Sequence, residues 1–240
     1  MKILLSGYGK MGKTIERIAS NRKHEVVHKL NSTPTGPQLQ EVDVVVDFST
    51  PDAAFINAKT VIESKKPIVM GTTGWRSYYD NIEELVKQNN GKFLYAANFS
   101  IGVNLFFRLN QELAKLMHPY QGYMPYLQET HHTEKLDAPS GTAIHLAEEL
   151  VDKKLVNNWK YPSKKANAGE LPVDAHRQED VKGIHELSYE SDIDCISIKH
   201  EAKARDGFAL GAVIAAEWLY QQQNTGVYTM QDVLQEPIKY

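Results

Sequence analysis

The chain has 240 residues, of which 42% are hydrophobic and 24% charged, and its formal net charge is −3 at pH 7. This composition is typical of a globular protein with one large or two small domains, and it argues against a strongly basic nucleic-acid-binding protein. The single cysteine, Cys195, allows no disulfide within the chain, which favours a reducing compartment. We find no apolar run of membrane-spanning length. The opening residues, MKILLSGYG, run straight into a glycine motif and do not resemble a signal peptide, so we expect a cytoplasmic protein.

Short apolar strands and helical patterns alternate along the first hundred residues. Strands are predicted at residues 3–5, 26–27, 42–48, 67–70 and 93–96. Helices are predicted at residues 11–20, 51–64 and 77–88, and the second of these follows an N-cap and a proline in the segment STP. The segment VDVVVDF is nearly continuous and β-branched, as expected of a strand covered on both faces. The alternation predicts an α/β fold with a Rossmann-like, doubly wound parallel sheet.

The pattern changes after about residue 101. Helices are predicted at residues 104–116, 141–153 and 208–220, and strands at 125–129, 183–189 and 193–200, whereas 157–180 is interpreted as loop-rich. In the last strand, Ile196 and Ile198 alternate with polar residues, which fits a sheet with one solvated or partner-covered face.

These patterns predict two domains. Residues 104–211 are expected to form an α+β domain for substrate binding and oligomerisation. The apolar helix at 208–220 is expected to return to the first domain. Residues 1–103 and 212–240 would then form the dinucleotide-binding domain.

The segment GYGKMG at residues 7–12 fits the pattern G-x-G-x-x-G. Gly7 would allow the tight turn, Gly9 would let the backbone approach a pyrophosphate, and Gly12 would let the helix pack on the strand. The helix N-terminus also favours an anion. A bare match can be a structural glycine turn, but this one follows a predicted strand and opens a predicted helix. We therefore predict a dinucleotide site here.

The end of the second strand bears on the choice of cofactor. NAD enzymes commonly place an acid there to hold the ribose 2′-hydroxyl, but the corresponding residue in this chain is Asn31. A neutral asparagine does not repel a 2′-phosphate, and Lys29 lies nearby in the sequence. NADPH is therefore admissible, or even favoured, unless Lys29 is simply a solvated side chain.

Two further strand ends carry candidate cofactor contacts, because ligands bind at the carboxyl ends of strands in parallel sheets. The segment GTTG at residues 71–74 suits close approach to a nicotinamide or ribose, although a plain loop explains it equally well. Asn98 and Phe99 follow the next strand and are candidates to line the cofactor. For Asn104 we favour a cap on the following helix.

The densest polar segment is HHTEKLDAPSGTA at residues 131–143. Its last residues open an apolar-periodic helix, whose N-terminal N–H groups make a natural carboxylate site. Thr142 can add a hydroxyl, and Lys135 supplies a cation. His131 and His132 follow a predicted strand, so their side chains should point to opposite faces and have different roles. The segment predicts an anionic substrate, most simply a carboxylate.

The same region also contains side chains that could bind a metal ion. The candidate ligands are His131, His132, Asp137 and His145. Their spacing matches no tetrahedral zinc pattern, and the lone cysteine is far away in the sequence. We expect no metal.

Nearly the whole chain resembles 4-hydroxy-tetrahydrodipicolinate reductase, also called dihydrodipicolinate reductase, a family of the diaminopimelate route to lysine. The segments that carry the resemblance are GYGKMG, DVVVDFSTPDAA, GTTGW, AANFSIGVN, ETHHTEKLDAPSGTA, IKHEAKARDGFALGAV and TGVYTMQDVL. The pattern E-x-H-H-x-x-K-x-D-A-P-S-G-T-A is highly specific. Residues around 157–180 look less standard, and nothing is carried over there.

The resemblance implies that NADH or NADPH reduces a cyclic imine dicarboxylate, with loss of water from the hydroxylated substrate, in a homotetramer. It implies His131 as catalytic acid/base and Lys135 as proton donor, and which of them delivers the proton is left open. Implied substrate contacts are His132, Ser140, Gly141 and Thr142. Implied cofactor contacts are Gly7, Tyr8, Gly9, Lys10, Met11, Gly12, Asn31, Phe48, Gly71, Thr72, Thr73, Ala96, Ala97, Asn98 and Phe99. Asn31 stands where many members carry an acid, which puts a preference for NAD in doubt.

Two other interpretations remain open. Another two-domain NAD(P) dehydrogenase, of aspartate or homoserine type, would share the glycine motif but not the segment HHTEKLDAPSGTA. A non-catalytic NADPH-binding sensor would have no need of a proton donor, so His131 and Lys135 argue against it. No nucleic-acid or membrane partner is expected.

Overall fold

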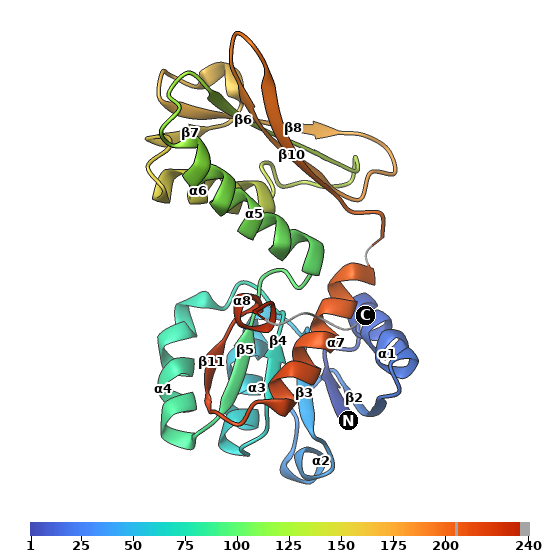
Figure 1. Ribbon diagram of the computed structural model, residues 1–240. Helices are drawn as coiled ribbons and strands as arrows, with labels where there is room; N and C mark the ends of the chain where they lie inside the picture. Colours follow the sequence, from blue (N-terminus) through green and yellow to red (C-terminus); the bar gives the residue numbers. More distant parts are fainter. Residues whose placement is uncertain (205, 236–240) are drawn as a thin grey trace. The chain divides into compact units, whose positions relative to one another are not determined.

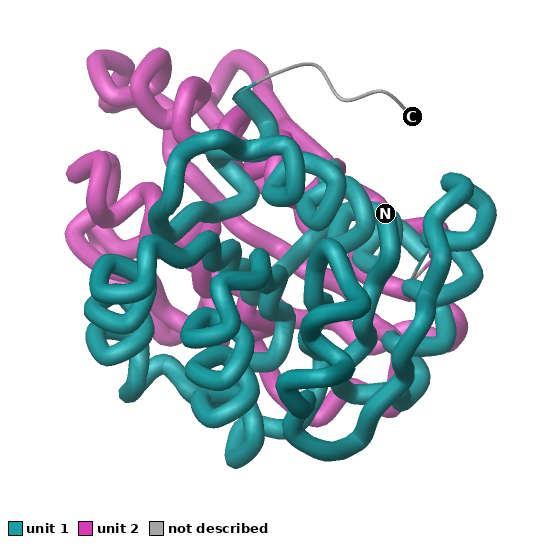
Figure 2. The backbone as a smooth tube through the Cα atoms, turned by 90° about the horizontal axis from the view of Figure 1, so that it is seen from below, with its two compact units in different colours: residues 1–101, 206–240 teal, residues 102–205 magenta. Residues whose placement is uncertain are grey.

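The computed structural model describes residues 1–204 and 206–235, which fall into two compact units (Figures 1 and 2). The first unit comprises residues 1–101 and those from 206 onward, and the second comprises residues 102–205. The chain thus changes units at the N-terminal ends of two helices, α5 (Ile101–Met117) and α7 (Asp206–Gln221). The boundaries expected after residues 103 and 211 lie inside these helices. Among the described residues, we find no helix with the length and apolar character of a membrane span.

The first unit is built on a six-stranded sheet in which every paired strand is parallel, in the order β11-β5-β4-β3-β1-β2. The strands are β1 (Lys2–Ser6), β2 (Glu25–Leu30), β3 (Val44–Asp47), β4 (Ile68–Met70), β5 (Lys92–Tyr95) and β11 (Gly226–Tyr228). The direction in which strands are added reverses between β1 and β3, and ligands bind in the crevice outside the carboxyl ends at such a point. The predicted Rossmann-like sheet is confirmed.

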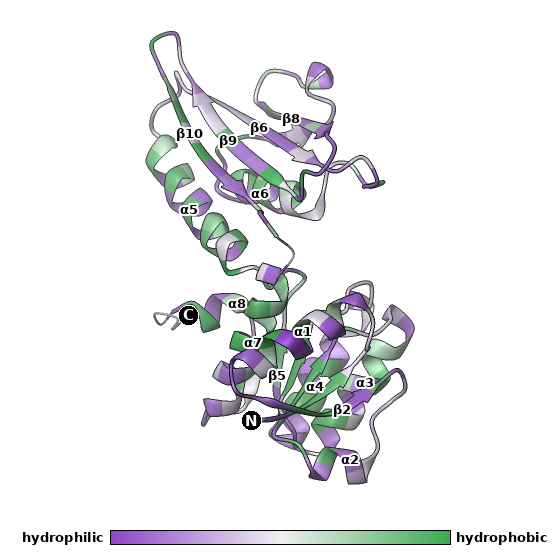
Figure 3. Ribbon diagram, turned by 90° about the vertical axis from the view of Figure 1, so that its right-hand side faces the viewer, coloured by the Kyte–Doolittle hydropathy of each residue, from purple (hydrophilic) through white to green (hydrophobic). Residues whose placement is uncertain are grey.

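Alternate side chains of each inner strand enter two separate cores. Ile3 and Leu5 pack in the core formed with α1 (Lys10–Asn21) and α7, whereas Leu4 packs in the core formed with α3 (Pro51–Glu63) and α4 (Tyr79–Asn89). Because both faces are covered, the inner strands are apolar over most of their length, as their green colour in Figure 3 shows.

Helix α7 contributes a row of buried small and apolar residues to the first of these cores. Gly211 lies so close to the carbonyl of Phe99 that a Cβ there would collide with it. This packing confirms the expectation that the apolar helix at 208–220 returns to the first domain.

Several short elements of the first unit were not predicted. They are α2 (Gly36–Gln40), η1 (Arg76–Tyr78), β11 and α8 (Met230–Val233). Elements of three to five residues are too short to show a hydrophobic period. Strand β2 is longer than predicted because it lies at the sheet edge, where polar residues such as Glu25 and Lys29 are tolerated.

The second unit contains a five-stranded mixed sheet in the order β10-β9-β6-β8-β7. Its strands are β6 (Met124–His131), β7 (Asn158–Lys160), β8 (Glu170–Arg177), β9 (Ile184–Glu190) and β10 (Cys195–Glu201). Helices α5 and α6 (Gly141–Asp152) pack on one face, over Leu127, Val173 and Leu187. The predicted α+β class of this unit is confirmed.

The interpretation of residues 157–180 as loop-rich was wrong. This segment contains β7, the short helix η2 (Ser163–Lys165) and β8, which pairs in parallel with both β6 and β7. Leu171 and Val173 alternate with less buried neighbours, a period of two that marks a strand. Pro172 argued against a strand in the sequence, because proline is rare inside sheets.

The cap assigned to Asn104 was also wrong. Helix α5 begins at Ile101, so Asn104 lies inside its first turn and is buried. The helix starts early because Ile101 and Val103 are themselves buried in apolar cores.

Candidate active site

The glycine loop follows β1 and opens α1, as predicted. Gly7 has a φ of +87°, and a Cβ at this position would collide with the carbonyl of Phe48 at the end of β3. A Cβ at Gly12 would lie 2.5 Å from the carbonyl oxygen of Gly7, whereas one at Gly9 would meet nothing within 4 Å. Two glycines therefore allow close packing, and the third leaves the helix N-terminus open to a ligand. This geometry fits a dinucleotide pyrophosphate.

Asp47 forms hydrogen bonds that connect the ends of β3 and β4. It is fully buried at the end of β3, and its carboxylate accepts hydrogen bonds from Ser49 Oγ at 2.8 Å, Thr72 Oγ1 at 2.7 Å and Asn57 Nδ2 at 2.9 Å. The Thr72 hydroxyl is thus engaged, whereas Thr73 is exposed. We had not singled out Asp47, although an acid that ends a β-branched strand is a usable signal.

Asn31 and Lys29 both lie beside the glycine loop. Asn31 Oδ1 accepts a hydrogen bond from the backbone N–H of Tyr8 at 2.8 Å. Lys29 Nζ lies 2.6 Å from Glu16 Oε1, and the Tyr8 hydroxyl donates to the same carboxylate. The hydrogen bond with Glu16 raises the pKa of Lys29. Lys29 is therefore a paired cation rather than a freely solvated one.

Phenylalanine rings line the carboxyl ends of the next strands. The rings of Phe48 and Phe99 have centroids 5.7 Å apart, and a Cβ at Gly71 would collide with the Phe48 ring. Phe99 is almost fully buried, so its side chain belongs to the core. Asn98 Oδ1 accepts from the N–H of Ser100 at 2.8 Å, while Ala97 is exposed. The residues predicted for the cofactor therefore gather at one edge of the sheet.

In the second unit, the period of β6 places Leu127, Glu129 and His131 on the face covered by helices. Glu129 stands directly opposite His185 on β9, and His131 stands opposite Arg177 on β8. The sequence analysis did not identify Glu129, His185 or Arg177 as candidates. Glu129 had a usable signal, since it lies two residues before His131 on the same strand.

Glu129 is a fully buried carboxylate with several donors around it. Ser140 donates its backbone N–H to Oε1 at 2.9 Å and its hydroxyl to Oε2. His185 Nε2 lies 3.3 Å from Oε2. Burial alone would raise the pKa of Glu129, but the hydrogen bonds from His185 and Ser140 hold it below the usual value.

Ser140 is also the N-cap of α6, since its Oγ accepts from the N–H of Ala143 at 3.2 Å. Its hydroxyl is therefore occupied by structural partners. The predicted substrate contacts that stay open are Gly141, which is exposed, and Thr142, which is half-buried. Their N–H groups have no hydrogen-bond partner among the described residues. A Cβ at Gly141 would meet nothing within 4 Å, which leaves room for a carboxylate.

His131 is 8% exposed, and its Nδ1 lies 3.6 Å from Glu129 Oε2. Burial lowers the pKa of His131 to about 4, although the Glu129 charge acts in the opposite direction. The imidazole is consequently neutral at neutral pH. His132 is half-buried, one residue beyond the end of β6.

Lys135 lies in the loop between β6 and α6. Its Nζ is 2.8 Å from both carboxylate oxygens of Asp137, and this hydrogen bond lowers the pKa of Asp137. Arg177 holds the loop, donating from Nε to the carbonyl of Lys135 at 3.1 Å and from Nη2 to that of Asp137 at 2.7 Å. The ammonium is thereby kept on a loop anchored to β8.

Comparison with known proteins assigns the chain to a family. The family model described as dihydrodipicolinate reductase, N-terminus, matches residues 1–99, and the one described as dihydrodipicolinate reductase, C-terminus, matches residues 102–234. The chain belongs to the dihydrodipicolinate reductase family. A 4-hydroxy-tetrahydrodipicolinate reductase of Christiangramia forsetii is 47% identical over 242 residues, which cover 100% of both chains. Another, of Rickettsia rickettsii, is 37% identical over 97% of this chain and 98% of its own length.

A solved dihydrodipicolinate reductase of Paenisporosarcina sp. TG-14, with dipicolinate bound, shares the fold of this family member. The TM-score is 0.77 at 21% sequence identity, and the match covers 98% of this chain and 99% of that one. Membership in the dihydrodipicolinate reductase family confirms the resemblance, and the chain is an oxidoreductase that uses NADH or NADPH. It also decides against the aspartate or homoserine dehydrogenase families.

Three side chains of this reductase could in principle bind a metal ion. Ligand atoms of Glu129, His131 and His185 all lie within 4.8 Å of one another. The carboxylate, however, already accepts hydrogen bonds from Ser140 and lies beside His185 Nε2. We therefore interpret the group as a hydrogen-bonded network.

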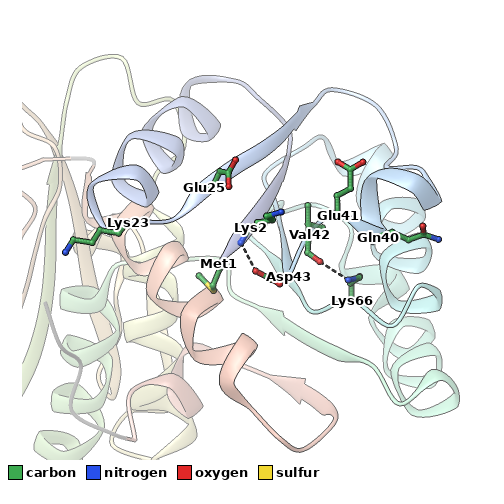
Figure 4. Close-up of a pocket in the computed structure, with 9 residues that line it drawn as sticks. All are labelled: Met1, Lys2, Lys23, Glu25, Gln40, Glu41, Val42, Asp43 and Lys66. Carbon is green, nitrogen blue, oxygen red and sulfur yellow. Dashed lines mark hydrogen bonds between the residues drawn. The ribbon is translucent and has the colours of Figure 1, made fainter.

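The first unit of the reductase fold has a polar hollow of about 490 Å³ (Figure 4). It is formed at the amino ends of the strands of the first unit, where Lys2 N–H donates to Asp43 at 2.7 Å and Lys66 Nζ donates to the Val42 carbonyl at 2.8 Å. Ligands of parallel sheets bind at the opposite, carboxyl edge. We assign it no function.

Proposed function

We propose that this chain reduces 4-hydroxy-tetrahydrodipicolinate to tetrahydrodipicolinate. One hydride from NADPH or NADH and one proton are added, and one water is lost. The observation that carries the proposal is the segment from His131 to Thr142, which combines an open helix N-terminus, a lysine and a neutral histidine in one unit. The name of its 47% identical relative supports the same reaction.

The substrate is a dicarboxylate, and the second unit offers it complementary groups. One carboxylate would accept hydrogen bonds from the open N–H groups of Gly141 and Thr142. Lys135 and His132 would contact the rest of the molecule. The dipicolinate held by the solved relative is also a dicarboxylate.

Proton delivery is assigned to Lys135 rather than His131. His131 is neutral at neutral pH and so lacks the extra proton of an imidazolium. The Lys135 ammonium can donate a proton to the reduced ring and can stabilise negative charge that develops there. Asp137, at 2.8 Å, would keep the ammonium oriented until substrate arrives.

The cofactor is assigned to the first unit. The open N-terminus of α1 at Gly9 would hold the pyrophosphate, and Asn31 would face the adenine ribose. When bound, the nicotinamide supplies the hydride. The Lys29–Glu16 pair offers a cation near Asn31 without an unpaired acid, which supports use of NADPH as well as NADH.

A homotetramer and a cytoplasmic location belong to the same proposal. Helices α5 and α6 cover one face of the second sheet, and neither of them packs on the other. That face is available for another copy of the chain. Cys195 is exposed and unpaired, which suits a reducing compartment.

The test is NAD(P)H oxidation with freshly generated 4-hydroxy-tetrahydrodipicolinate, with aspartate semialdehyde as the competing substrate. Lys135→Ala should lower kcat by about 10²–10⁴-fold, the usual contribution of a positioned proton donor. Lys164→Ala, at an exposed lysine of the same unit, should leave kcat unchanged. Turnover of the semialdehyde alone, or of neither compound, would overturn the proposal. Near-normal turnover by Lys135→Ala would remove Lys135 from the mechanism.

A further inference from the structure

The proposed reaction gives no role to the buried carboxylate of Glu129. Glu129 is 1% exposed on the central strand of the second sheet, and an ionised carboxylate in such a place is costly unless donors surround it. A hydrophobic residue on the same face of the strand, such as Leu127, is buried at a lower cost in free energy. A role for Glu129 in the site would explain why a carboxylate occupies this position.

The side chains around the Glu129 carboxylate come from three chain segments. Ser140 donates to both carboxylate oxygens, and His185 Nε2 lies 3.3 Å from Oε2. The His131 ring approaches the same oxygen with Nδ1, at 3.6 Å. A carboxylate accepts hydrogen bonds and donates none, so it favours the proton on the nitrogen that faces it.

The two nitrogens of His131 have different surroundings. Nδ1 is buried and has no partner within hydrogen-bond distance in the described part of the chain, and it faces Glu129 Oε2 at 3.6 Å. Nε2 lies on the side of the ring that faces Gly183, and a Cβ added at Gly183 would lie 3.2 Å from it. The His185 ring packs edge-on against His131, with ring centroids 5.0 Å apart, and so limits its rotation.

We propose that Glu129 is a positioning residue, which holds His131 as the tautomer with Nδ1–H toward the carboxylate and leaves Nε2 as a hydrogen-bond acceptor for the substrate. His185 and Ser140 fix the carboxylate in turn. The inference rests on the proposed function for its purpose, but the tautomer itself is a property of the free protein.

An acceptor at Nε2 complements Lys135. Lysine has donors only, whereas a neutral imidazole with a bare Nε2 accepts a hydrogen bond from a hydroxyl or a ring N–H. The hydroxylated substrate carries a hydroxyl, whereas its ring nitrogen is an imine without a hydrogen. Lys135 on the loop would therefore donate to the substrate, and His131 on the strand would accept from it. A carboxylate that fixes a histidine tautomer is a recurrent arrangement in enzymes and metal sites.

The direct test measures the tautomer in the wild-type protein. Nitrogen-15 NMR of the histidine-labelled full chain, without substrate, reports which ring nitrogen carries the proton. His131→Gln identifies the His131 signal among the nine histidines. We expect a neutral ring protonated at Nδ1 at neutral pH. A ring protonated at Nε2, or at both nitrogens, would overturn the proposal even if the reductase assay succeeds.

A matched pair of variants tests the role of Glu129. Glu129→Gln removes the charge but keeps the size, so the His131 signal should shift toward the Nε2–H tautomer. We expect kcat to fall by about 10²-fold or more, with a smaller change in KM for the cofactor. The control is Glu149→Gln, because Glu149 is also buried in this unit and accepts from Asn110 at 2.6 Å and Gln111 at 2.7 Å.

The outcomes separate positioning from simple stability. If both variants lose kcat equally and neither moves the His131 signal, Glu129 is structural only and the proposal fails. A folded Glu129→Gln variant with the wild-type tautomer would also overturn it. Should that variant not fold, the wild-type tautomer still decides.

Discussion

Asn31 combines a hydrogen bond to the glycine loop with a proposed role in cofactor choice. Its Oδ1 receives the N–H of Tyr8, so the residue helps to hold the glycine loop that follows β1. Asn31 is also the first residue after β2, where Rossmann folds contact the adenine ribose. An aspartate could accept the same N–H, which makes the charge at this position separable from its structural role.

Asn31→Asp should therefore change cofactor preference without disturbing the loop. The new carboxylate would repel a 2′-phosphate and accept from a 2′-hydroxyl, so the ratio of NADPH to NADH affinity should fall by about tenfold or more. Titration of both cofactors measures this ratio. Asn21→Asp, which adds the same charge at the end of α1, is the control. An unchanged ratio would show that residue 31 does not select the cofactor.

At the scale of elements, one serine joins a helix to a strand. Ser140 caps α6 through Ala143 N–H and donates two hydrogen bonds to Glu129 on β6. The start of α6, with its open N–H groups at Gly141 and Thr142, is thereby fixed against the strand that carries His131. This link holds the proposed carboxylate site and His131 together within one unit.

Ser140→Ala should be more destabilising than the loss of an ordinary cap. It removes the cap and one donor to a buried carboxylate, so we expect a loss of about 2–4 kcal/mol in the free energy of unfolding. The comparison is Thr229→Ala, the cap of α8 on the surface, which should cost about 1 kcal/mol. Urea denaturation measures both. Equal losses would mean that the bond to Glu129 contributes nothing.

At the scale of the whole molecule, the sheet of the second unit has one face on which helices α5 and α6 do not pack. Ile198 of the edge strand β10 packs toward the core, so Ser197 and Lys199 face the opposite side. Ser197 pairs with Ser188 of β9, which extends this face inward. The two small serine side chains leave room there for sheet-on-sheet contact between copies.

Ser197→Arg should accordingly break the proposed tetramer. Light scattering should give four times the chain mass for the wild type and a smaller mass for the variant, because the added charge cannot be buried at a sheet interface. Ser20→Arg, on the exposed surface of α1, should leave the mass unchanged. A wild-type mass equal to one chain would contradict the proposal.

The sequence by itself determined the features that depend on neighbouring residues. The strand and helix alternation of the first unit follows from local hydrophobic periods, and GYGKMG and HHTEKLDAPSGTA each fold as one loop and one helix start. The candidate residues in these segments were therefore predictable.

The tertiary structure decided what depends on pairing between distant segments. Glu129 meets His185 because β6 and β9 pair in one register, and Arg177 holds the Lys135 loop because β8 lies beside β6. Asp47 engages the Thr72 hydroxyl because β3 and β4 end together. Register is set by burial of whole sheet faces, so no local pattern reveals which side chains will stand opposite one another.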